Sequence, residues 1–182
     1  MRRIALLALA ASALLAGAAQ ADPAFDAYRN FCIAGRGAAP SALAAADAAG
    51  WSRVPPQQLS QPGLQNADGR VLAMPGGAAA ILITAIQDVP QLGPSRMCMV
   101  GAVPASSSDL GSQLAAFAGV PKQTSPELPE GLYAWRDENG RHISIEQGTP
   151  DYRAQFASGA ALIATTRTLP QMTMIVLMSA AQ

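Results

Sequence analysis

The chain has 182 residues, of which 50% are hydrophobic and 13% are charged, and its 12 basic residues balance its 12 acidic ones. This composition excludes a disordered chain, and the lack of net charge excludes the basic footprint that binding to nucleic acid or to an anionic membrane surface requires. The single histidine excludes metal sites built from several histidines.

Residues 1–21 have the three-part pattern of a secretory signal peptide. Two arginines follow the initial methionine, residues 4–15 carry no charge, and a run of small residues ends at Ala21. The apolar stretch is shorter than the roughly 20 residues that a membrane-spanning helix needs. We therefore expect cleavage after Ala21, a periplasmic or secreted protein without a membrane span, and a single domain over residues 22–182.

The mature chain begins with two predicted helices. An acidic residue followed by a proline is a typical helix start, which predicts a first helix over residues 23–34. Ser41 is expected to cap a second helix that ends at Ala49. Trp51 follows at once, and an aromatic residue in this position is expected to fill the core, with a binding groove as the alternative.

Two long segments rich in proline interrupt the pattern. Residues 52–69 and 119–131 are expected to be loops, and their length suggests functional elements. Between them, Ser106 to Ser108 with Asp109 are expected to start a helix with an apolar stripe that ends at Gly119. Residues 147–159 are expected to be irregular or briefly helical.

Apolar runs bounded by turn residues predict the strands. The strongest local signal is Asn139-Gly140 between two such runs, which predicts a β-hairpin. The last run is apolar throughout and is expected to lie in the middle of the sheet. The predicted strands cover residues 70–74, 79–86, 96–103, 132–137, 141–146, 160–168 and 172–179.

These elements predict an α+β fold. We expect a mainly antiparallel sheet of about five to seven strands, because hairpin-length links connect most of the runs. The two N-terminal helices and the one inserted helix are expected to pack together on one face of this sheet.

The only two cysteines are Cys32 and Cys98. In an oxidising compartment such a pair predicts a disulfide, which would stabilise the domain by roughly 4 kcal/mol in the chain-entropy treatment. The alternative is a copper site, because Met97, Cys98 and Met99 place three sulfurs in a row and such ligands suit Cu(I). Successive side chains of a strand point to opposite faces, which argues against that site.

The predicted hairpin gathers polar and aromatic residues that deserve a test for catalysis. His142 is expected to lie opposite Asp137, with Ser144 on the same face. Residues two apart on one strand stand parallel, about 7 Å apart, so a serine nucleophile would not reach its base. The same region supplies a possible binding surface, made of Trp51, Tyr133, Trp135 and His142.

Several local motifs resemble those of small exported proteins of proteobacteria, an uncharacterised family. They are Phe31-Cys32, the Gly50-Trp51 pair, the segment 96–100, and the strand from Gly131 to Trp135. The resemblance implies export and the Cys32–Cys98 disulfide. It implies no activity and no catalytic residue.

The sequence carries no phosphate-binding, dinucleotide-binding or calcium-binding motif, so we expect no cofactor and no metal. The leading hypothesis is a non-catalytic binding protein of the cell envelope, with a protein or peptidoglycan as its partner and with no nucleic-acid ligand. The alternatives are a small periplasmic hydrolase that uses His142 and a copper-handling protein that uses Met97, Cys98 and Met99. The sequence leans against an enzyme.

Overall fold

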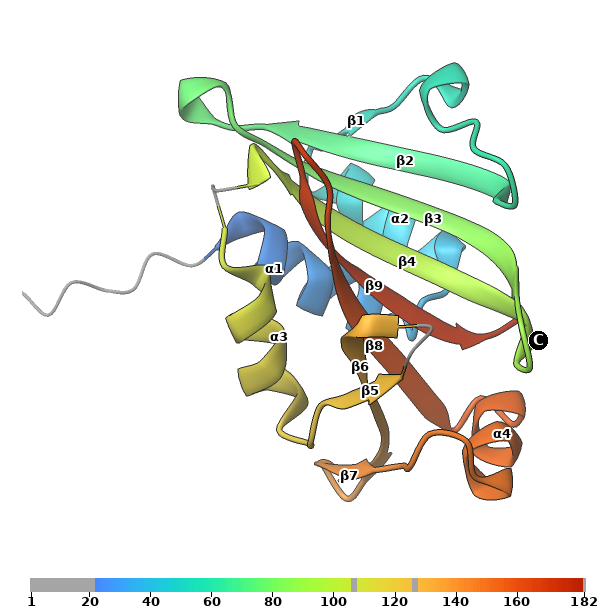
Figure 1. Cartoon of the computed structure of the whole chain (residues 1–182). Coiled ribbons are helices and arrows are strands. Elements are labelled where there is room, and N and C mark those ends of the chain that lie inside the picture. The colour runs from blue at the N-terminus through green and yellow to red at the C-terminus, as the bar shows by residue number, and fades with distance from the viewer. Residues whose placement is uncertain (1–21, 106–107, 126–127, 182) are drawn as a thin grey trace, which may run out of the picture.

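The computed structural model describes residues 22–105, 108–125 and 128–181, so the predicted signal peptide lies outside the described residues. A nine-stranded sheet forms the body of the protein (Figure 1). Its strands follow the order β1-β2-β3-β4-β9-β8-β6-β5, with β7 beside β6, and every pair is antiparallel. The α+β class is therefore confirmed.

The helices are α1 (Pro23–Ala27), the π-helix η1 (Tyr28–Ile33), α2 (Ala39–Ala48), α3 (Leu110–Ala118) and α4 (Pro150–Ala157), with short 3₁₀ turns η2 (Pro56–Gln58) and η3 (Pro75–Gly77). The strands are β1 (Ser52–Arg53), β2 (Gln65–Ala73), β3 (Ala79–Val89), β4 (Gly93–Val103), β5 (Gln123–Ser125), β6 (Leu128–Glu138), β7 (Arg141–Ser144), β8 (Ala161–Thr168) and β9 (Thr173–Ala180).

The main core lies between the sheet and the helices α1, η1, α2 and α3, on what we call the helix-covered face. Side chains alternate between the two faces of a strand, so every second residue of the central strands enters this core. Leu82, Val100 and Leu177 do so from three neighbouring strands, and Tyr28 and Leu114 meet them from the helices. As predicted, the last strand, β9, lies in the middle of the sheet, between β4 and β8.

A disulfide joins the N-terminal helical segment to a central strand. Cys32 in η1 is bonded to Cys98 in β4, with Cα atoms 5.5 Å apart, and both residues are completely buried. The predicted bridge is therefore present in the fold, and it fastens the helical layer to the middle of the sheet.

The two N-terminal helices and the inserted helix share one face as expected, whereas the segment 147–159, expected to be irregular or briefly helical, forms α4 on the other face. Its Tyr152 and Phe156 pack with Ala134 and Ile163 on the other side of the sheet and form a small second core. Thr149 caps the helix, since its side chain accepts a hydrogen bond from the Tyr152 N–H. The helix is short and lacks a sustained apolar stripe, which is why the sequence pattern gave only a weak helical signal.

The strand count exceeds the five to seven expected, and the segment 52–69 is only partly a loop. β1 pairs with β2, which begins at Gln65, five residues before the predicted start. β5 lies in the other predicted loop. The start of β2 was missed because its polar residue Asp68 pairs with Arg70 on the helix-covered face instead of following an apolar pattern.

Ser41 does not cap the second helix. α2 begins at Ala39 and has Ala38 at its N-cap position, without a side-chain cap. The Ser41 hydroxyl donates instead to the Ala38 carbonyl. Proline near the helix start set the boundary here, because its fixed φ favours the first turn of a helix.

Arg70 is a nearly buried cation held by two carboxylates. Its Nε and Nη2 donate to Asp47 at 2.5 and 3.1 Å, and its Nη1 donates to Asp68 at 2.9 Å. The hydrogen bond from Arg70 lowers the pKa of the Asp47 carboxyl below its ordinary value. The pair therefore ties α2 to β2.

We expect the Asp47→Asn variant to be less stable than the wild type at pH 7 and equally stable near pH 2. A carboxyl with a lowered folded-state pKa contributes stability above its unfolded pKa, about 3.9, and loses it as the pH falls through the folded value. Urea unfolding at both pH values measures the difference, with Asp88→Asn at an exposed position as the matched control. An equal difference at both pH values would contradict the role of the charge.

Candidate functional site

The aromatic residues proposed as a binding surface are buried. Trp51 and Tyr133 are each 8% exposed, and Trp135 is completely buried. All three belong to the main core, where Trp51 packs edge-on against Phe31. The structure thus corrects this prediction, because these side chains are not accessible to a partner of the folded protein, although the filling role expected of Trp51 is confirmed.

His142 lies where the hairpin register predicted, opposite Asp137. Its Nδ1 is 3.0 Å from the Ala118 carbonyl oxygen and its Nε2 is 3.3 Å from Asp137 Oδ1. Since a carbonyl oxygen only accepts, Nδ1 carries a proton. The ring also packs against Trp135 and Phe117. Both ring nitrogens thus have protein partners, and the imidazole joins the end of α3 to the hairpin.

The three sulfur-bearing residues of β4 separate as strand geometry requires. Cys98 points to the helix-covered face and is bonded to Cys32, whereas Met97 and Met99 pack in a different cluster. The copper alternative therefore loses its thiolate ligand. Among the described residues, no group of three or more His, Cys, Asp or Glu side chains is placed to hold a metal ion.

The opposite face of the central strands carries a patch that we call the methionine face. The register aligns three rows of side chains across β8, β9, β4, β3 and β2. Almost every member is apolar, and the polar one inside it, Thr165, is satisfied by donating to the Gly131 carbonyl. The rows are Arg167-Met174-Gly101-Ile81-Val71, Thr165-Val176-Met99-Ile83-Gly69 and Ile163-Met178-Met97-Ala85, of which the third ends at β3 because the β2–β3 register shifts there.

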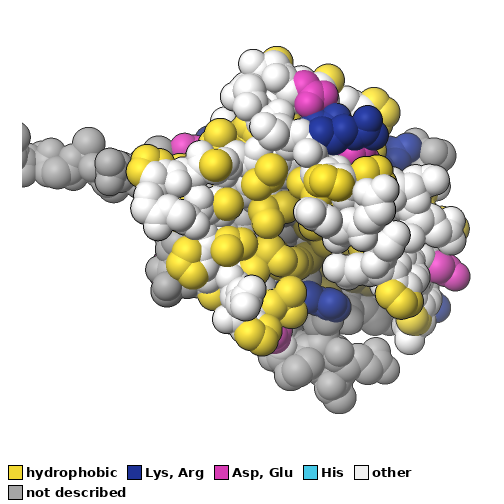
Figure 2. Space-filling view, turned by 90° about the horizontal axis from the view of Figure 1, so that it is seen from above, with side chains coloured by type: hydrophobic (Ala, Val, Ile, Leu, Met, Phe, Trp, Pro, Cys, Tyr) yellow, Lys and Arg dark blue, Asp and Glu magenta, His cyan; other side chains and the backbone are white. Residues whose placement is uncertain are grey.

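No helix of the described residues covers the middle of this face, since α4 packs only near its β6 and β8 side. Two glycines of the rows are covered by single side chains. Leu59 lies over Gly69 and Met172 lies over Gly101, where an added Cβ would come within 3.2 and 2.6 Å of them. Around these two side chains, Val176 is 3% and Met99 is 9% exposed, whereas Ile83, Met174 and Met178 are half-buried. Figure 2 shows hydrophobic side chains gathered there in one field, with charged groups along its border.

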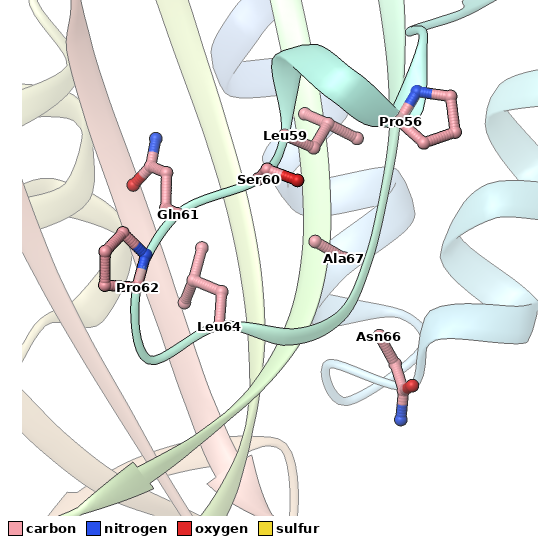
Figure 3. Close-up of a pocket in the computed structure, with 8 residues that line it drawn as sticks. All are labelled: Pro56, Leu59, Ser60, Gln61, Pro62, Leu64, Asn66 and Ala67. Carbon is pink, nitrogen blue, oxygen red and sulfur yellow. The ribbon is translucent and has the colours of Figure 1, made fainter.

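A hollow of about 470 Å³ lies beside β2, between this strand and the loop that contains η2. Figure 3 shows Leu59, Leu64 and Ala67 on the inner side of this loop, whereas Asn66 points away. Leu64 and Ala67 also pack against the methionine cluster. The hollow is therefore an extension of the methionine face at its β2 edge, and it lies in one of the two segments that the sequence marked as functional.

One charged residue belongs to the three rows. Arg167 stands opposite Met174 and is exposed. Within the part of the chain that the structure describes, its guanidinium has no ion-pair or hydrogen-bond partner. The face thus combines an extended apolar surface with a single unpaired cation at the β8 side.

Comparison with known proteins gives no relative: the chain matches no protein family, no curated protein and no solved structure. The resemblance to exported proteobacterial proteins stays a prediction. Among the described residues no helix has the length and apolar character needed to cross a membrane.

Sequence reasoning missed the methionine face. Five of the seven methionines lie on it or over it, whereas Met74 packs against the main core. A signal was present in the spacing of the methionines. Met97 and Met99 are two residues apart on one strand, and Met174 and Met178 are four residues apart on another, so the members of each pair share a face of their strand. The sequence did not show that these two strands, β4 and β9, are neighbours in the sheet; only the topology showed it.

Proposed function

We propose that this is an exported, non-catalytic binding protein of the cell envelope, and that its ligand is an anionic amphiphile with one hydrocarbon chain. The observation that carries the proposal is the methionine face, whose middle no helix of the described residues covers, with Arg167 at its side. The buried Cys32–Cys98 disulfide fits export, since such bonds persist in oxidising compartments.

The chemistry of the face favours a hydrocarbon over an extended peptide. A peptide laid on these side chains would lose hydration of its N–H and C=O groups and would find no partners for them, which is costly. Strand addition at a sheet edge would satisfy those groups, but the edge strands β1 and β5 have only 2 and 3 residues. Peptidoglycan is polar and faces the same difficulty.

Methionine suits a surface that must accept a flexible chain. Its unbranched, polarisable side chain adapts to irregular partners, and methionine is common on adaptable binding surfaces. Met174 and Met178 are half-buried on this face and pack against the buried Met99. They would rearrange around a bound chain at little cost.

The dimensions and the charge of the face agree with such a ligand. Four strand spacings separate Arg167 on β8 from the hollow at β2, a distance of about 19 Å. This is comparable to the length of an extended long-chain fatty acid. The guanidinium of Arg167 would pair with a carboxylate or phosphate head group, and the far end of the chain would enter the hollow beside Leu64.

Palmitate binding to the mature protein, measured by calorimetry below the micellar concentration, tests the proposal. Arg167→Ala is expected to weaken binding about tenfold, a loss of about 1.4 kcal/mol. Ile83→Glu is expected to abolish it, because it puts a charge in the middle of the face. Arg153→Ala, at an exposed position of α4, is the matched control and should bind as the wild type does.

Three results would overturn the proposal. They are undiminished palmitate binding by Ile83→Glu, equal losses in Arg167→Ala and Arg153→Ala, and no binding by the wild type. Sedimentation of the unliganded protein tests the remaining alternative, in which a second copy of the chain packs on this face. A dimer that Ile83→Glu converts to a monomer would assign the face to a second copy of the chain.

A further inference from the structure

The methionine face also brings two neighbouring thioethers of β4 beside a third from β9, a strand distant in the sequence. Met97 on β4 is directly opposite Met178 on β9, and Met99 follows two residues further along β4. All three belong to one packed cluster, in which Met97 is 7% and Met99 is 9% exposed. From this arrangement we propose a site for a soft monovalent cation, Cu(I) or Ag(I), ligated by Met97, Met99 and Met178.

The register sets the spacing of the three side chains. Directly opposite residues of an antiparallel pair have Cβ atoms about 5 Å apart, and residues two apart on one strand are about 7 Å apart. Each sulfur lies two bonds beyond its Cβ, on a side chain with three rotatable bonds. Rotation of the three side chains can therefore bring the sulfurs to one point between β4 and β9 without movement of the backbone.

The donor set selects the ion. Thioethers are soft ligands that suit Cu(I), whereas carboxylate and imidazole donors suit harder ions, and the three rows of the methionine face contain no Asp, Glu or His. Three neutral donors also leave the ionic charge uncompensated, and the cost of burying a charge rises steeply with its magnitude. Divalent ions are thus disfavoured on both counts.

The compartment makes thioethers useful ligands. Both cysteines of the chain are bonded to each other, so neither supplies a thiolate. Thioethers stay competent where cysteine pairs are oxidised. Met174 is a less suitable third ligand than Met178, because Arg167 stands directly opposite it and repels a cation.

Titration with Ag(I), which needs no reductant, tests the site. We expect the mature protein to bind one ion, and the Met97→Leu/Met99→Leu/Met178→Leu variant to bind at least 100-fold more weakly. Cu(I) should behave in the same way under ascorbate, a reductant chosen to leave the disulfide closed. Met74→Leu, on the helix-covered face, is the matched control and should bind as the wild type does.

Methyl resonances provide a test that needs no variant. In protein labelled at the methionine methyl groups, Ag(I) should shift the signals of Met97, Met99 and Met178 and leave that of Met74 unchanged. Uniform shifts, or equal affinity of the wild type and the triple leucine variant, would overturn the site.

This inference does not rest on the proposed function. Leucine keeps the face apolar, so the triple variant should still bind palmitate. The ion site and the amphiphile site can therefore be tested separately. The triple leucine variant should lose Ag(I) binding and keep palmitate binding, whereas Ile83→Glu should lose palmitate binding and keep Ag(I) binding.

Discussion

Replacing both cysteines, as Cys32→Ala/Cys98→Ala, is expected to lower the free energy of unfolding by roughly 4 kcal/mol. The bridge joins residues 66 positions apart, so its removal frees a long loop in the unfolded chain. A typical domain has a total stability of about 5–15 kcal/mol, so this loss is a large share of it. Both side chains are completely buried, and alanine is chosen because a serine hydroxyl at either position would be buried without a partner.

Urea unfolding of the variant against the oxidised wild type measures this effect. The wild type treated with a thiol reductant is the matched control, and it should unfold at nearly the same urea concentration as the variant. A variant within about 1 kcal/mol of the oxidised protein would show that packing alone holds η1 against β4. Two free thiols in protein purified from its native host would show that Cys32 and Cys98 are not bonded to each other.

The parts of the fold that the sequence predicted well are those with strong local signals. Asn139-Gly140 set the β6–β7 hairpin and its register, because a two-residue turn fixes which residues face each other. Asp109 and Gly119 mark the two ends of α3 as expected, with a side-chain cap at one and a left-handed residue at the other. In such segments the local preference and the tertiary fold agree.

The parts that were missed depend on contacts between distant segments. β2 begins before its apolar run, where Asp68 is neutralised by Arg53 of β1 and by Arg70, pairings that no local pattern shows. α4 forms because Tyr152 and Phe156 find a second apolar patch on the sheet. The short strands β1 and β5 are stabilised by their neighbours rather than by their own composition.

The same limit applies to the candidate site. A strand that is apolar on both sides predicts burial on both faces of the sheet, and β4 and β9 are such strands. The sequence could not tell which face the helices would cover. Trp51 and Trp135 were therefore candidates for a binding surface and proved to be core, whereas Met97 and Met99 pack in a second buried cluster on the other face of the sheet.

Replacing Trp135 by alanine is expected to cost about 3–5 kcal/mol, because it leaves a large cavity in the main core. Trp135 is the largest completely buried side chain, and it packs edge-on against Phe117 of α3 at 6.3 Å. Its Nε1 has no hydrogen-bond partner among the described residues, so the loss comes from packing. Trp135→Phe should therefore cost much less, since it keeps a ring and removes an unsatisfied N–H.

Urea unfolding of both variants measures the two costs. The control is Leu169→Ala in the turn between β8 and β9, where Leu169 is 45% exposed and little change is expected. The alanine variant should also release His142, whose ring centroid lies 5.1 Å from that of Trp135. If Trp135→Ala cost less than Leu169→Ala, the indole would not be packed between the hairpin and α3. If Trp135→Phe cost as much as Trp135→Ala, the indole N–H would have a partner, and the polar end of this side chain rather than its volume would hold the hairpin against the helix.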